Sequence, residues 1–98
     1  MIIKHVLEEL KTSERPVAKA LHSGTGFKVL AIGLKSGMKL KEHKAHLPSK
    51  LTVLEGEIIY QESGKAETIK QYGEVNIPVN IVHSVEAVQD SLCLLTQG

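Results

Sequence analysis

Two segments of this chain each begin with a glycine turn, continue as a short strand-like run and lead to a histidine. The first is Gly37–His43, with His46 after it, and the second is Gly73–Pro78, with His83 after it. This pattern, given twice, can bring two imidazoles from distant parts of the chain together inside one small β structure. Imidazole is the side chain best suited to hold a borderline transition metal, so the two segments constrain the fold and indicate a candidate site.

From Pro16 onward the sequence consists of short apolar segments separated by turn residues, which is typical of β strands. Many short strands at close spacing favour a sandwich or barrel over a parallel α/β fold. Before them, Val6, Leu7 and Leu10 share one side of a short predicted helix over about residues 3–10. The sequence therefore predicts an all-β fold with a short N-terminal helix. The expected strands cover residues 17–22, 27–35, 39–43, 51–54, 57–61, 66–71, 75–77, 82–88 and 92–96.

Length and composition limit what the chain can do. Its 98 residues are enough for one domain with one modest core. Twelve basic and eleven acidic residues nearly cancel, and only 3% of the residues are aromatic, which leaves little for base stacking on a nucleic acid. No run approaches the ~20 apolar residues of a membrane span, and charges interrupt the first residues where a signal peptide would be apolar. We expect a cytoplasmic protein that has neither a nucleic-acid partner nor a membrane contact.

Cys93 is the only cysteine, so no internal disulfide can form. It lies in the apolar run 92–95, where we expect a buried and unreactive thiol. In that run, the residues that would point to either face of the strand are all apolar. One face would then line the barrel, while the other meets a second sheet or a partner subunit. From this pattern we infer a homodimer.

The position of each histidine in its strand decides where it points. Side chains alternate in a strand, so His83 shares a face with Val85 and Ala87, and this more apolar face is expected to point inward. A histidine there is either a ligand or a core imidazole bonded to a carbonyl group. His43 ends its strand at the opposite parity to Leu40, so either a bulge intervenes or one of the two faces outward.

Three of the five histidines form the candidate metal site. His43, His46 and His83 together supply three nitrogens, enough for a metal that keeps positions open for substrate or water. His46 is expected in a loop. His5 and His22 lie outside the two segments, and we interpret them as surface residues.

Both segments resemble the two motifs of the cupin superfamily, whose fold is a double-stranded β-helix, a small jelly-roll barrel. The matching positions are Gly37, His43 and Gly56 in the first motif and Gly73, Pro78 and His83 in the second. Asn80 stands where the second motif has its glycine. The resemblance implies one cupin domain over residues 1–98, with a core at about 28–96.

Two positions at which the first motif would supply ligands carry other residues here. Its second histidine falls on Ala45, with His46 one residue later, and its carboxylate falls on Ser49, whose hydroxyl is a poor ligand for a divalent ion. The missing carboxylate removes both a ligand and a charge that offsets the metal's own. With His46 in reach, three histidines can hold zinc, iron, nickel, manganese or copper. Without it, His43 and His83 would bind weakly and the site would be empty.

Three functions fit these residues. The first, which we favour because the shortest cupins often have reduced metal sites, is a binding or sensing module that holds a small molecule in the barrel. That ligand would be anionic if Lys39, Lys41 or Lys50 lined the mouth. The second is a metal-dependent enzyme, dioxygenase-like or isomerase-like, with the three histidines as ligands. The third is a core without a ligand, in which the histidines of the two motifs bond to each other or to the backbone.

Overall fold

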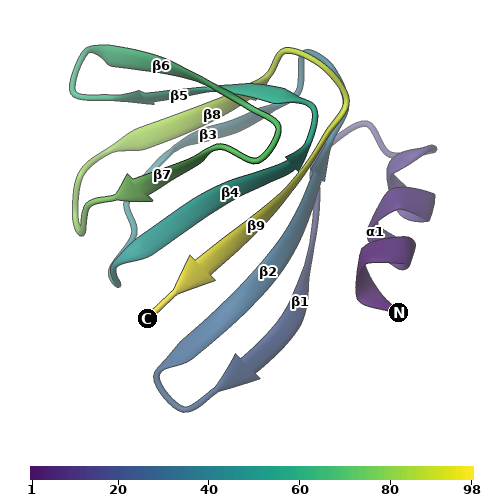
Figure 1. Ribbon diagram of the computed structural model, residues 1–98, viewed down its shortest axis with the longest axis horizontal. Coiled ribbons are helices and arrows are strands. Elements are labelled where there is room, and N and C mark those ends of the chain that lie inside the picture. The colour runs from purple at the N-terminus through teal and green to yellow at the C-terminus, as the bar shows by residue number, and fades with distance from the viewer.

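The computed structural model describes residues 1–98 and contains one helix followed by nine strands (Figure 1). The elements are α1 (Ile2–Leu10), β1 (Val17–Gly24), β2 (Phe27–Leu34), β3 (Lys39–His43), β4 (Ser49–Glu55), β5 (Glu57–Glu62), β6 (Lys65–Lys70), β7 (Glu74–Ile77), β8 (His83–Ala87) and β9 (Ser91–Gln97). Every predicted strand is present, and no strand end differs from the prediction by more than two residues.

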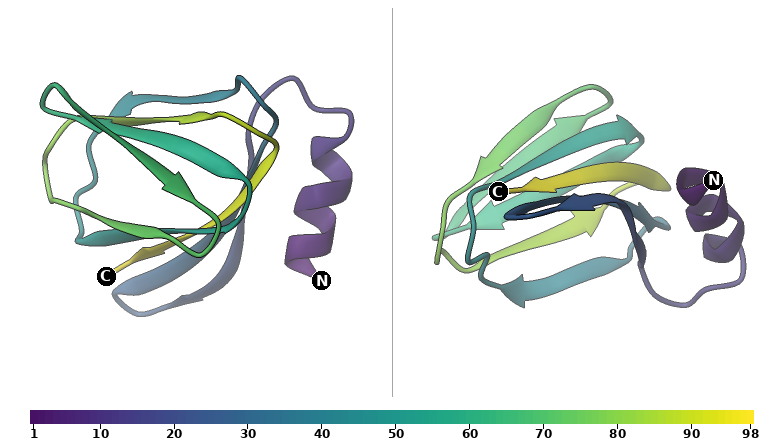
Figure 2. Two further views of the ribbon diagram at one scale, coloured as in Figure 1. Left: turned by 45° about the horizontal axis from the view of Figure 1, so that its top comes forward. Right: turned by 90° about the horizontal axis from the view of Figure 1, so that it is seen from below.

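The strands form two antiparallel sheets that face each other (Figure 2). One sheet has five strands in the order β1-β2-β9-β4-β7, and the other has four in the order β3-β8-β5-β6. The chain passes from one sheet to the other after β2, β3, β4, β6, β7 and β8, which is the winding of a jelly roll. The predicted all-β jelly roll with a short N-terminal helix is confirmed.

The main core lies between the two sheets, where apolar side chains alternate with outward polar ones. On β8 the alternation is as predicted, because His83, Val85 and Ala87 are all buried. Cys93 is also buried in this core, as expected. The buried apolar residues of the cluster are Ile32, Leu34, Ala45, Leu51, Val53, Ile58, Tyr60, Ile69, Ile77, Val85, Ala87 and Cys93.

A second cluster lies on the outer face of the five-stranded sheet, where α1 packs (Figures 1 and 2). Its buried members are Val6, Leu10, Val17, Ala31 and Leu92. Gly33 allows the close approach of the helix, since a Cβ there would lie 2.9 Å from Val6 Cγ1. The second apolar face of β9 is therefore covered by the chain's own helix, where we expected a second sheet or a partner. The nine-residue α1 is too short to cross a membrane, and no other helix is present that could.

Left-handed residues make two of the turns that the motifs require. Gly56 has φ +90° between β4 and β5, and a Cβ there would lie 2.8 Å from Ser91 Cα. Asn80, which replaces the glycine of the second motif, has φ 62°. Asparagine tolerates this conformation better than most residues do, so the substitution keeps the turn.

Candidate functional site

Strands β3 and β8 bring two of the predicted histidines together. The two strands are antiparallel neighbours, and His43 lies opposite His83 in their register. The ring centroids are 4.2 Å apart, with the ring planes at 58°. A bulge between Leu40 and His43 shifts the register, and this lets Leu40 pack against the core while His43 meets His83. Of the two alternatives left open by the sequence, the bulge is the correct one.

Hydrogen bonds to the backbone fix the tautomer of both rings. His43 Nδ1 lies 2.7 Å from the carbonyl oxygen of Lys41, and His83 Nδ1 lies 3.1 Å from that of Ile81. A carbonyl oxygen can only accept, so in each neutral ring Nδ1 carries the proton and donates it. The Nε2 atom of each ring is then left with a free lone pair. The backbone bonds foreseen for a ligand-free core are therefore present, but each uses only one nitrogen of its ring.

His83 is buried, yet one of its nitrogens remains open. Its side chain is 3% exposed, and its only hydrogen bond is the one made by Nδ1. No buried side-chain nitrogen or oxygen in the structure lacks a partner, so the unpartnered Nε2 must reach solvent. Burial lowers the pKa of His83 below the usual value of 6.5, and the neighbouring His43 lowers it further. The ring is therefore neutral at pH 7.

Two further residues, Tyr60 and Glu62, belong to the site and were missed in the sequence. The Tyr60 ring stacks on His83, with centroids 5.9 Å apart, and its hydroxyl donates a hydrogen bond to the Glu62 carboxylate. Burial, and then Glu62 itself, raise the pKa of Tyr60 above its usual value, so the phenol stays protonated. The available signal was the alternation along 57–62, which places Ile58, Tyr60 and Glu62 on one face.

The structure does not bring His46 to the pair. His46 is exposed in the loop between β3 and β4, and no group of three or more His, Cys, Asp or Glu side chains is arranged to hold a metal ion. Ala45 and Ser49, which stand at the two altered motif positions, are both buried. The Ser49 hydroxyl donates to the Leu47 carbonyl at 2.9 Å and accepts from Gln97 at 3.2 Å. It is therefore already used within the protein, and metal binding stays a prediction.

The lysines considered for an anionic ligand lie on the outside of the barrel. Lys39 and Lys41 line a trough on the outer face of the four-stranded sheet, and Lys39 lies 3.9 Å from a carboxylate oxygen of Glu86. Lys50 pairs with Glu74 at 3.3 Å on the other sheet. None of the three is placed to supply a positive charge beside the two imidazoles.

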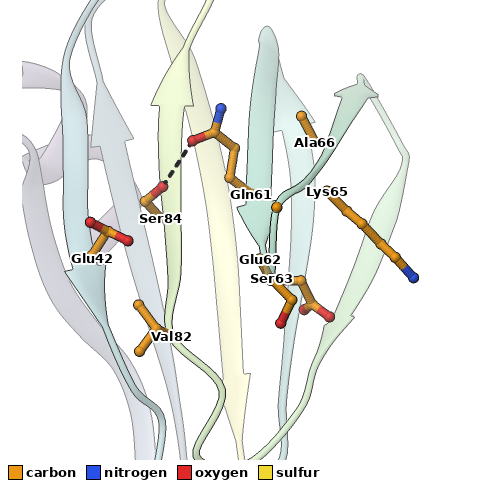
Figure 3. A pocket seen from close by; sticks show the side chains of 9 residues that line it. Glu42, Gln61, Glu62, Ser63, Lys65, Ala66, Val82 and Ser84 are labelled. Carbon is orange, nitrogen blue, oxygen red and sulfur yellow. Dashed lines mark hydrogen bonds between the residues drawn. The ribbon is translucent and has the colours of Figure 1, made fainter.

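A polar pocket of about 290 Å³ lies on the same outer face, next to the hairpin between β5 and β6 (Figure 3). In it Ser84 and Gln61 point toward each other, with a hydrogen bond of 3.4 Å from the serine hydroxyl to the amide oxygen. Glu42 also lines the pocket, so it faces away from the core, as alternation with His43 predicts. Neither His43 nor His83 lines this pocket, although Glu62 of the histidine site does.

No family model matches the chain, and a search of curated proteins finds no match. Solved structures do match it. A cupin 2 conserved barrel domain protein from Leptotrichia buccalis has a TM-score of 0.81 and 29% identity, and the match covers 93% of this chain but only 45% of that protein. An RmlC-like cupin from Desulfovibrio desulfuricans has a TM-score of 0.77 and 26% identity over 85% of this chain and 81% of its own. A cupin superfamily protein from Desulfitobacterium hafniense has a TM-score of 0.82 at 12% identity, over 87% of this chain and 78% of its own.

Proposed function

We propose that this chain, a small cupin-domain protein, binds a small molecule at the His43–His83 pair. The observation that carries the proposal is the free Nε2 of His83, an open acceptor on a side chain that is 97% buried. A polar atom set into an apolar core is costly unless it is hydrogen-bonded, so its one open direction is suited to a ligand or a water molecule. The Tyr60 ring, stacked on His83, adds a flat apolar wall and stiffens the site.

A divalent transition metal is the second candidate, with zinc, iron, nickel, manganese and copper all compatible with imidazole. Supporting it, both rings donate Nδ1–H to a backbone carbonyl, which is the arrangement that orients histidine ligands in metal sites. His43 and His83 fit as two ligands, and His46 would have to move in as the third. When bound, such a metal supplies Lewis-acid chemistry, and a metal-dependent enzyme, dioxygenase-like or isomerase-like, is the alternative function that follows.

We further propose a cytoplasmic homodimer without a nucleic-acid partner. Cys93 is a free, buried thiol, which supports a cytoplasmic location. The formal net charge of +1 gives little electrostatic attraction to a nucleic acid. Leu21 and Phe27 support the dimer, since both are about 40% exposed on the edge hairpin of β1 and β2. Light scattering on the protein as it elutes from a size-exclusion column measures the mass of the assembly directly.

Metal analysis and ligand screening of the purified protein test the binding proposal. We expect thermal shifts with some members of a panel of small molecules, and their loss in His43→Ala, which removes an exposed imidazole and should leave the fold intact. The matched control is His5→Ala, an exposed histidine on α1. A stoichiometric metal that is lost in His43→Ala but kept in His5→Ala would favour the second candidate. Binding that is unaffected by His43→Ala, or no binding of any kind, would contradict the proposal.

A further inference from the structure

We infer that the ligand of the His43–His83 site is an uncharged hydrogen-bond donor, such as a hydroxyl or amide compound, with an apolar body. This inference rests on the proposed function and adds the chemical class of the ligand. It comes from the groups that the site can offer: two acceptor nitrogens and an apolar rim.

The polar part of the ligand must donate. Both rings use Nδ1–H on a backbone carbonyl, so each presents Nε2 as an acceptor. Turning over either ring would give up its bond to the carbonyl. A carboxylate or phosphate would place its own lone pairs against these nitrogens and gain no hydrogen bond.

The charges around the pair also disfavour an anion. Glu62 lies opposite His83 in the register of β5 and β8, and its carboxylate is held by Tyr60. Among the groups that act on the pKa of His83, Glu62 is the negatively charged one, and it raises that pKa, against the larger effects of burial and of His43. Lys39 and Lys41 lie on the outer face of the sheet, whereas Lys44, which follows His43 directly, is exposed in the loop after β3. An anion at the pair would therefore meet the like charge of Glu62.

The body of the ligand meets a rim formed by the loops 44–48 and 78–82, which flank the two histidines in sequence and are apolar except for Lys44, His46 and Asn80. These loops lie side by side, because the Asn80 N–H donates to the Ala45 carbonyl at 2.8 Å. Loop 78–82 contains no charged residue. Leu47 is 45% exposed and Val79 is 39% exposed. An apolar group that covers these side chains removes their surface from water, whereas a sugar or other polyol would lose hydration there.

Four benzene derivatives of similar size separate the chemical classes: phenol donates, anisole cannot donate, benzoate is an anion and benzylamine is a cation. Binding to the full chain is followed by NMR shifts of the histidine rings. We expect phenol to shift both rings of the pair and to bind about tenfold more tightly than anisole, the usual effect of one lost hydrogen bond. Benzoate should be the weakest of the four.

Variants then assign the effect to the site. His43→Phe keeps a ring but removes an acceptor, so phenol should lose its advantage over anisole, and His5→Phe is the matched control. Leu47→Ser should weaken phenol and anisole together. Benzoate or benzylamine binding as tightly as phenol would overturn the ligand class but leave the binding site standing. The ligand class would also be wrong, and the binding site would still stand, if other molecules of the panel bind at the pair and phenol does not. If no molecule of any class shifts the rings, both the inference and the proposed function fail.

Discussion

Gly56→Ala tests how much the tight turn between β4 and β5 contributes to the stability of the fold. Gly56 has φ +90°, and a Cβ there would lie 2.8 Å from Ser91 Cα and closer still to Ser91 Oγ and the Asp90 carbonyl oxygen. Ser91 Oγ is part of the same junction, because it accepts a hydrogen bond from the Glu57 N–H at 3.1 Å. The methyl group therefore cannot be accommodated unless the turn moves away from β9.

Two costs add up in this variant. A left-handed backbone costs a residue with a Cβ about 1–2 kcal/mol, and forcing a group into a packed site typically costs about 1–3 kcal/mol more. We therefore expect a loss of about 2–5 kcal/mol in the free energy of unfolding. For a domain of this size each kcal/mol lowers Tm by about 4–8 °C.

Urea unfolding followed by circular dichroism measures the loss, and Gly37→Ala is the matched control. Gly37 has φ +86°, but a Cβ there meets nothing within 4 Å. The control should therefore show only the backbone cost of about 1–2 kcal/mol, and the difference between the two variants isolates the contact with Ser91 and Asp90. Equal destabilisation of the two variants would refute this reasoning.

Three further predictions concern titration and buried groups. Because the pKa of His83 is lowered below 6.5, the unfolded chain binds a proton that the folded chain excludes as pH falls through 6.5, so stability drops with falling pH. The drop in urea midpoint should be smaller in His83→Gln, and an equal drop would argue against a lowered pKa. Burial raises the pKa of Cys93 to about 11, so iodoacetamide at pH 8 should modify the thiol only after unfolding; rapid modification of the native protein would contradict its burial. Tyr60→Phe removes the hydrogen bond to Glu62 but keeps the ring, and should cost about 1 kcal/mol in urea unfolding; no loss would mean that the bond does not stabilise the fold.

The fold could be predicted because its signals are local. Short apolar segments between turn residues indicate the strands, and glycines at positions such as Gly37 and Gly56 mark turns with positive φ. The partner of an apolar face is not a local property. The apolar residues on the second face of β9 indicate only that something covers that face. The docking of α1 at Gly33 depends on packing between segments far apart in the chain.

The site could be predicted only in part, for the same reason. His43 and His83 are marked by their motifs, and the structure places them opposite each other. The bulge that allows this depends on how β3 pairs with β8, which the sequence left open. Tyr60 and Glu62 join the site through the register of β5 against β8, and no motif marks them. Strand register is set by pairing across the whole sheet, so alternation along 57–62 can put Tyr60 and Glu62 on one face but cannot put that face beside the histidines.

The central claim is that two imidazoles meet at one end of the barrel with Nδ1 protonated and Nε2 free. NMR of ¹⁵N-labelled protein at pH 7 tests it directly, because the ring nitrogen shifts report the tautomer and nuclear Overhauser effects report ring contacts. We predict the Nδ1–H form for both His43 and His83, with cross-peaks between the protons of the two rings. The Nε2–H form in either ring, or the absence of any contact between the rings, would contradict the account.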